Sequence, residues 1–274
     1  MSDSPGPVTR FDAAFAERPA DSLPGLIPYF TAGYPHLEST AALLMTAQRA
    51  GCLAVEAGIP FSDPLADGPT VQRSGQVALG NGMTLTRALT QIREARQRGL
   101  TIPVAVMTYI NPVLSFGIAA FADDAALAGV DGLIIPDLPL DEAADVRAAA
   151  HDRGIALIPM VAPTTTPERL ARICSSAAGF VYCVGVTGVT GARREIAGDA
   201  IALLESVRAI ADVPRALGFG LSTNAHLTAL RGHAEAAAVG SALLDSIARD
   251  TDHAELAAER FLRSMMGTPV ANAG

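Results

Sequence analysis

Short apolar runs alternate with amphipathic segments along nearly the whole chain. The apolar runs are continuous, which is typical of strands that are buried on both faces of a sheet. Most of them are followed, after a loop, by a segment with helical periodicity. The pattern predicts strands at residues 26–30, 53–58, 103–109, 132–135, 155–160, 180–184, 215–219 and 236–239. It predicts helices at residues 11–18, 37–50, 85–98, 118–128, 142–153, 167–176 and 200–210, and after each of the last two strands.

Eight strand–helix units in roughly 250 residues, after a short N-terminal helix, predict an α/β fold of the (β/α)8 TIM-barrel type. An open doubly wound sheet is the alternative. Its first strand would usually be followed by a GxGxxG turn, and the sequence TAGYPH at residues 31–36 is not one. Because we find no internal linker, we expect one domain over residues 1–274, with flexible ends at 1–7 and 268–274.

The carboxyl ends of the strands are where such barrels place their active sites. Polar side chains at the expected strand ends are Tyr29, Thr31, Glu56, Tyr109, Asn111, Asp137 and Tyr182. The two longest loops, residues 59–82 and 185–199, follow the second and sixth strands. Loops of this length are usually lids, binding loops or disordered segments, so these two are either functional loops or flexible surface.

Glu56 is the most informative of these residues, because it lies inside an otherwise uncharged strand. With strand periodicity, Glu56 shares a face with Ala54 and Gly58, and the other face carries Leu53, Val55 and Ala57. Glu56 is therefore expected to point inward among small neighbours. Burying an unpaired carboxylate is costly, so chance placement is a poor explanation. The alternative is a surface glutamate on a short edge strand.

The charge and the cysteines narrow the class of protein. A net charge of −8 and a pI of about 5.1 argue against nucleic acid or an anionic membrane as the main partner. No apolar run approaches the roughly 20 residues of a membrane span, and the N-terminal segment lacks the pattern of a secretory signal. The three cysteines show no CxxC spacing. They are expected to be reduced and buried, in a cytoplasmic protein.

The chain contains no lysine, since all 20 of its basic residues are arginine. A Schiff base between the protein and a carbonyl substrate or pyridoxal phosphate is therefore excluded. The five histidines are scattered, with no i, i+4 pair and no HxH sequence, which argues against a catalytic metal. We expect carboxylates, hydroxyls and backbone dipoles to carry any chemistry.

A phosphate site is predicted after the seventh and eighth strands, where GFGLS (218–222) and VGSA (239–242) occur. Barrels commonly bind phosphate at this place with backbone N–H groups and a helix N-terminus. Ser241 is expected to cap the next helix. The segment VTGVTGA (186–192), with Thr190, could close over the same anion. Alone, GFG could also be an ordinary tight turn.

Several motifs together resemble the alpha subunit of tryptophan synthase, over about residues 11–265. The most specific are GIPFSDPLADGPTVQ (58–72) and GVTGAR (188–193), supported by IPYFTAGYP (27–35), MTYINPV (107–113), PDLP (136–139) and GFGLS. This family cleaves indole-3-glycerol phosphate to indole and glyceraldehyde 3-phosphate, a retro-aldol reaction. The resemblance implies that Glu56 is the acid/base and Asp67 the second catalytic carboxylate, with no cofactor. Substrate-binding positions are Tyr29, Tyr109, Tyr182, Thr190, Gly191, Phe219, Gly220, Gly240 and Ser241.

The resemblance also implies a partner, the beta subunit of tryptophan synthase, in an alpha2-beta2 heterotetramer. The implied contact includes Asp63, Pro64 and residues 111–116. Apolar side chains at Pro112, Val113, Leu114 and Phe116 are consistent with an exposed partner patch, and buried packing is the alternative. Three other functions stay open at this point. They are a stand-alone indole-releasing lyase, another phosphate-binding barrel such as a sugar-phosphate isomerase, and a catalytically inactive barrel that acts as an allosteric subunit.

Overall fold

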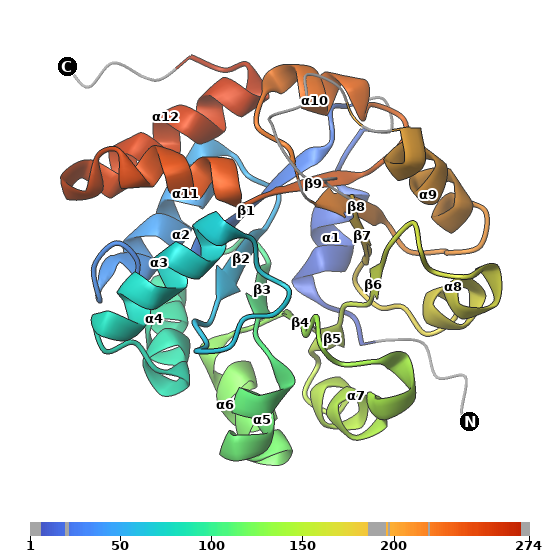
Figure 1. Cartoon of the computed structure of the whole chain (residues 1–274), viewed down its shortest axis with the longest axis horizontal. Helices are drawn as coiled ribbons and strands as arrows, with labels where there is room; N and C mark the ends of the chain where they lie inside the picture. The colour runs from blue at the N-terminus through green and yellow to red at the C-terminus, as the bar shows by residue number, and fades with distance from the viewer. Residues whose placement is uncertain (1–6, 20–21, 186–195, 197, 219, 270–274) are drawn as a thin grey trace.

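A parallel β-sheet at the centre of the molecule is surrounded by helices (Figure 1). The computed structural model describes residues 7–19, 22–185, 196, 198–218 and 220–269. The strands are β1 Gly25–Thr31, β2 Val55–Gly58, β3 Val104–Met107, β4 Gly132–Ile134, β5 Ala156–Leu157, β6 Met160–Val161, β7 Val181–Val184, β8 Arg215–Gly218 and β9 Ala236–Val239. They follow the order β5-β4-β3-β2-β1-β9-β8-β7-β6, and every pairing is parallel.

The barrel closes at the segment that contains β5 and β6, which the sequence predicted as one strand. Ile158 donates its N–H to Leu133 of β4, at 2.8 Å, and Pro159 accepts a hydrogen bond from the N–H of Tyr182 in β7, at 2.9 Å. One side of the segment therefore pairs with β4 and the other side with β7. Because proline has no N–H to donate, the ladder is interrupted between Leu157 and Met160. The predicted eight-stranded barrel is confirmed.

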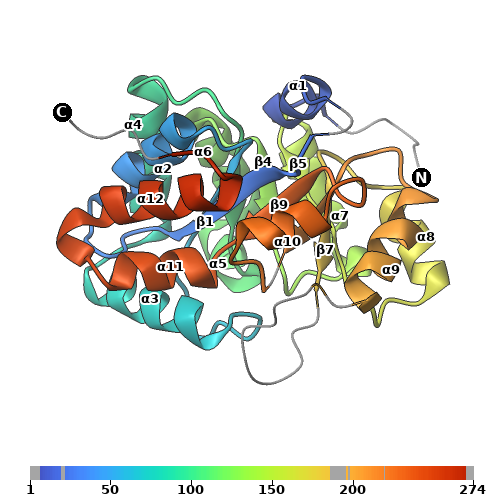
Figure 2. The ribbon, with the colours of Figure 1, turned by 90° about the horizontal axis from the view of Figure 1, so that it is seen from above.

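The helices cover the outside of the sheet. They are α1 Arg10–Ala16, α2 Ser39–Ala50, α3 Pro69–Gly80, α4 Leu85–Gln97, α5 Ile110–Phe116, α6 Ile118–Ala128, α7 Ala144–His151, α8 Pro167–Cys174, α9 Gly198–Arg208, α10 Asn224–Ala229, α11 Ser241–Ala248 and α12 Ala254–Met266, with 3₁₀ turns η1 Leu140–Glu142 and η2 Thr251–His253. The predicted N-terminal helix is present as α1. Figure 2 shows α1 at one end of the barrel and the loop that leads into α3 at the other.

Two helices were not predicted. Residues 59–82 were expected to be one long loop, but Pro69–Gly80 form α3, which starts with proline at its first turn. Two glycines within α3, at positions 75 and 80, weaken its local helical signal. Burial of Ser74, Gly75 and Ala78 against the barrel stabilises it instead. Helix α5 depends on a residue far along the chain, because Asp137 accepts a hydrogen bond from the N–H of Ile110 at 2.9 Å.

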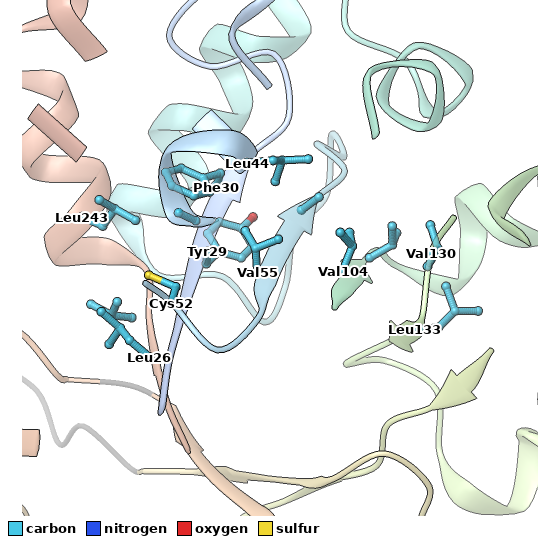
Figure 3. Close-up of a cluster of buried hydrophobic side chains, with 14 of the residues drawn as sticks. Leu26, Tyr29, Phe30, Leu44, Cys52, Val55, Val104, Val130, Leu133 and Leu243 are labelled. Atoms are coloured by element: carbon cyan, nitrogen blue, oxygen red, sulfur yellow. The ribbon is translucent and has the colours of Figure 1, made fainter. Parts of the chain in front are cut away.

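The core has two layers, on opposite faces of the sheet. The outer layer packs the strands against the helices, as Figure 3 shows for Phe30, Val55 and Leu243. The inner layer fills the barrel and includes Phe11 of α1, whose ring lies 5.3 Å from that of Phe180. Helix α1 therefore closes the barrel at the amino ends of the strands. Leu53 was predicted to share the outer face with Val55, but it precedes β2 and packs in the inner layer.

No single helix among the described residues is long and apolar enough to cross a membrane. By length and composition alone, one pair that is bent by 99°, Ile110–Phe116 with Ile118–Ala128, passes the same test together.

Candidate active site

Glu56 lies in the middle of β2, opposite Tyr29 of β1 and Ala105 of β3. Its side chain is buried, with 1% of the residue exposed, so the alternative of a surface glutamate on an edge strand is wrong. The Oε1 atom has no hydrogen-bond partner among the described residues. Burial without a partner disfavours the charged form and raises the pKa of Glu56 to about 8. The inward orientation was predicted from strand periodicity alone.

Asp67 lies two residues before α3, on the loop that follows β2. Burial raises its pKa to about 6, and a side-chain hydrogen bond from Tyr109 opposes part of that increase. The hydroxyl of Tyr109 also accepts the N–H of Ala66 at 3.0 Å, so this tyrosine holds the loop at Asp67 and at the residue before it. The ring of Phe61 packs on Tyr109 with 5.5 Å between centroids. The loop is therefore held over the end of β3.

Helix α3 secures the same loop from its other end. The hydroxyls of Thr31 in β1 and Ser74 in α3 are 2.6 Å apart and buried. Thr70 donates to Asp245 of α11 at 3.2 Å. Since Asp67 precedes the N-terminus of this anchored helix, the helix dipole favours its ionised form.

Tyr29 and Tyr182 are buried beside Glu56. The pKa of Tyr182 is raised well above its usual value, first by burial and then by the charges of Glu56 and Tyr29. The pKa of Tyr29 is raised by burial, then by Asp67 and Glu56, while a hydrogen bond with Thr31 opposes the increase. Tyr29 therefore lies near both carboxylates. Together, Glu56, Asp67, Tyr29, Tyr109 and Tyr182 form what we call the carboxylate–tyrosine cluster.

Two glycines create the space for the tyrosine rings, and sequence reasoning did not assign them this role. A Cβ at Gly58 would lie 2.0 Å from the Tyr29 hydroxyl oxygen, and a Cβ at Gly218 would lie 2.2 Å from that of Tyr182. Both contacts are far below van der Waals distance. The occurrence of glycine at two strand ends was the available signal, but which ring covers which glycine depends on the three-dimensional structure.

The expected phosphate loops lie side by side, because β8 pairs with β9 with Gly218 opposite Ala238. Gly220 has a φ of +76°, which favours glycine. Gly240 is the N-cap of α11 and Ser241 is its first helical residue, so the prediction that Ser241 caps the helix is wrong. Among the residues that the structure describes, no side chain caps this N-terminus. Its first N–H groups therefore remain available to an anion at the barrel mouth.

Other predicted residues lie elsewhere. Asp137 caps α5, and Asn111 is exposed on α5, so neither joins the cluster. Thr190, Gly191 and Phe219 lie outside the described residues, as does the segment 186–192. Within the described part of the chain, no three His, Cys, Asp or Glu side chains gather where they could hold a metal ion.

The fold and this arrangement define a class of protein, a (β/α)8 barrel with two carboxylates of raised pKa at its mouth, beside an uncapped helix N-terminus. Comparison with known proteins gives the family. The model of the tryptophan synthase alpha chain family matches residues 15–271. The tryptophan synthase alpha chain of Roseiflexus castenholzii is 44% identical, over 95% of this chain and 100% of its own length. That of Carboxydothermus hydrogenoformans is 43% identical, over 88% and 90% of the two chains.

Solved structures show the same likeness. A chain of Mycobacterium tuberculosis tryptophan synthase superposes with a TM-score of 0.87 at 35% identity, covering 95% of this chain and 98% of the other. A chain from the tryptophan synthase a2b2 complex of Pyrococcus furiosus superposes with a TM-score of 0.84 at 38% identity, covering 89% and 98%. The protein belongs to the tryptophan synthase alpha chain family.

Proposed function

We propose that this protein cleaves indole-3-glycerol phosphate to indole and glyceraldehyde 3-phosphate, as the alpha subunit of tryptophan synthase in tryptophan biosynthesis. The observation that carries the proposal is the position of Glu56, buried and unpaired beside Tyr29 and Tyr182 at the barrel mouth. A buried acid with a pKa near neutrality can both donate and accept a proton. The direct test is to mix the purified chain with indole-3-glycerol phosphate, with and without a beta subunit, and to measure indole.

Glu56 transfers protons in both halves of the proposed reaction. In its protonated form it donates to C3 of the indole, which makes the ring an electron-accepting cation. The resulting carboxylate then takes the proton of the glycerol hydroxyl next to the bond that breaks. The carbon–carbon bond electrons return to the ring as the aldehyde forms. Indole leaves, and Glu56 is protonated again, so the cycle needs neither an imine nor a metal.

Asp67 in this scheme stays ionised and stabilises positive charge at the indole N–H. With a pKa of about 6, it is mostly carboxylate at neutral pH. Glu56, with a pKa of about 8, is mostly protonated under the same conditions. The two environments thus separate the protonation states of two carboxyl groups, as acid/base sites require.

The pH dependence of kcat/KM should therefore be bell-shaped. The rate rises with pH as Asp67 ionises, near pH 6, and falls as Glu56 loses its proton, near pH 8. The measurement is initial indole release by the free chain from pH 5 to 9 at low substrate concentration. A profile that is flat between pH 5 and 9 would contradict these assignments.

The remaining assignments concern binding. We propose that Gly220, Gly240 and Ser241 hold the phosphate at the N-terminus of α11, and that Tyr29, Tyr109 and Tyr182 bound the rest of the substrate pocket. Thr190, Gly191 and Phe219 belong to the proposal on resemblance alone.

The chain's free cysteines, Cys52, Cys174 and Cys183, are buried, which supports a reducing compartment, the cytoplasm.

A beta subunit is the proposed partner, in an alpha2-beta2 heterotetramer. Leu65 and Leu114, on the segments after β2 and β3, are 92% and 55% exposed, which leaves two large apolar side chains at the barrel mouth. Asp63 and Asn111 beside them are exposed as well, and Pro64, Pro112 and Phe116 are partly exposed. Val113 is buried on the inner side of α5, so buried packing is the alternative that holds for this residue.

Leu65→Asp should weaken binding of the beta subunit by tenfold or more, because it places a charge in an apolar contact. Leu127→Asp is the matched control. Leu127 is 71% exposed at the C-terminal end of α6, which faces the opposite end of the barrel. Titration calorimetry with a beta subunit measures both affinities. Equal affinities for the two variants would remove the Leu65 surface from the interface.

A further inference from the structure

A cavity of about 270 Å³ lies between the barrel and helices α7 and α8, at the carboxyl ends of β4 and β5. None of the described residues of the carboxylate–tyrosine cluster or the phosphate loops lines it. Its walls come from the segment after β4, the β5–β6 strand, α7 and α8, and their accessible surface is about half apolar and half polar. The principal apolar residues of the lining are Ile135, Leu138, Leu140, Leu157 and Ile173.

Two arginines line this cavity, Arg147 of α7 and Arg169 of α8. The Nε atom of Arg147 is buried and has no hydrogen-bond partner in the described structure. Burial lowers the pKa of Arg147, and no carboxylate opposes that change. An unpaired buried donor of a cationic group is costly, so a ligand that accepts its N–H is favoured.

The lining carries two arginines and one acidic residue. Asp137, the one acid among the lining residues, accepts the N–H of Ile110 at 2.9 Å. Asp141 pairs with Arg172, which lies on α8 but does not line the cavity. Thr165 accepts the N–H of Ala162 through its hydroxyl oxygen, which leaves the O–H free to donate. The polar part of the cavity therefore presents mainly donors and net positive charge.

We propose that this cavity binds a small organic anion that carries an apolar body, a monocarboxylate on a ring or branched chain. Its carboxylate accepts hydrogen bonds from Arg147 and Arg169, and its hydrocarbon part packs against the apolar half of the lining. At about 30 Å³ for each water molecule, the volume holds about nine water-sized groups. Ring monocarboxylates of that size match the space, the charge and the apolar half of the lining, whereas a free inorganic anion would leave that apolar half uncovered.

Benzoate and benzamide test the proposal, because they have the same shape and about nine non-hydrogen atoms each but differ in charge. Titrations follow the methyl resonances of Ile135 and Ile173, with saturating glycerol 3-phosphate present to occupy the phosphate loops. Benzoate should shift both methyl groups saturably, and benzamide should bind at least tenfold more weakly, because a charge-assisted hydrogen bond is lost.

Arg147→Gln should weaken benzoate binding about tenfold or more and bring it close to that of benzamide. Arg231→Gln, at an exposed arginine that does not line the cavity, is the control and should bind benzoate normally. Equal binding of benzoate and benzamide, or full benzoate affinity in Arg147→Gln with an unchanged melting temperature, would overturn the proposal. So would the absence of any shift up to 50 mM benzoate. The inference does not depend on the proposed reaction, since both readouts are independent of indole release.

Discussion

Glu56→Gln should reduce indole release by about 10²–10⁴-fold, because glutamine keeps the volume of the side chain but cannot transfer a proton. The fold should be retained, since Gln fits the same buried space beside Tyr29 and Tyr182. Steady-state assays with indole-3-glycerol phosphate, with and without a beta subunit, give the measurement. The loss should fall on kcat as well as kcat/KM, since proton transfer belongs to the transition state.

Ligand binding separates catalysis from folding in this experiment. Glycerol 3-phosphate should bind Glu56→Gln with nearly unchanged affinity, because the proposed phosphate contacts at Gly240 and Ser241 lie at the start of α11 rather than on β2. Turnover within a few-fold of the original protein would remove Glu56 from the mechanism. If neither protein released indole, the result would instead favour a catalytically inactive family member.

The position of Glu56 could be predicted from the sequence because it depends on local periodicity. A strand side chain points to one face or the other, and an apolar strand at the centre of a barrel has no wet face. Asp67 was identified from a motif, not from physics, because its environment comes from burial in the folded barrel and from Tyr109, which follows β3. The glycines under Tyr29 and Tyr182 likewise depend on packing between neighbouring strands.

The fold was predictable for the same reason, and the two missed helices share one cause. Continuous apolar runs followed by amphipathic helices define strand–helix units without knowledge of distant contacts. Helices α3 and α5 were missed because their stability comes from such contacts, the Ser74 hydroxyl with Thr31 and the Asp137 cap on Ile110. The cavity beside Arg147 also could not be predicted, because its lining comes from two helices and two strand ends that are separate in the sequence.

Between pH 5 and pH 8, the free energy of unfolding of Glu56→Gln should rise by roughly 3 to 4 kcal/mol relative to that of the original protein. The difference grows because the original protein loses stability over this range and the variant does not. The folded-state pKa of Glu56 is about 8, above its usual value of 4.5. The folded protein therefore holds a proton that the unfolded chain releases across this window. Stability from the protonated form is complete below about pH 4.5 and is lost as pH rises toward 8. Glutamine does not titrate, so the variant lacks that loss.

Urea unfolding of both proteins at pH 5, 6, 7 and 8 measures this difference, and the change in the difference with pH isolates residue 56. Glu94→Gln is the matched control, since Glu94 is a half-exposed partner of Arg98 on α4. That substitution should alter stability by less than about 0.5 kcal/mol at every pH. If the Glu56→Gln difference stayed constant from pH 5 to pH 8, Glu56 would titrate alike in the folded and unfolded chains. The donor for indole C3 would then have to be sought elsewhere, because Glu56 would already be ionised at neutral pH.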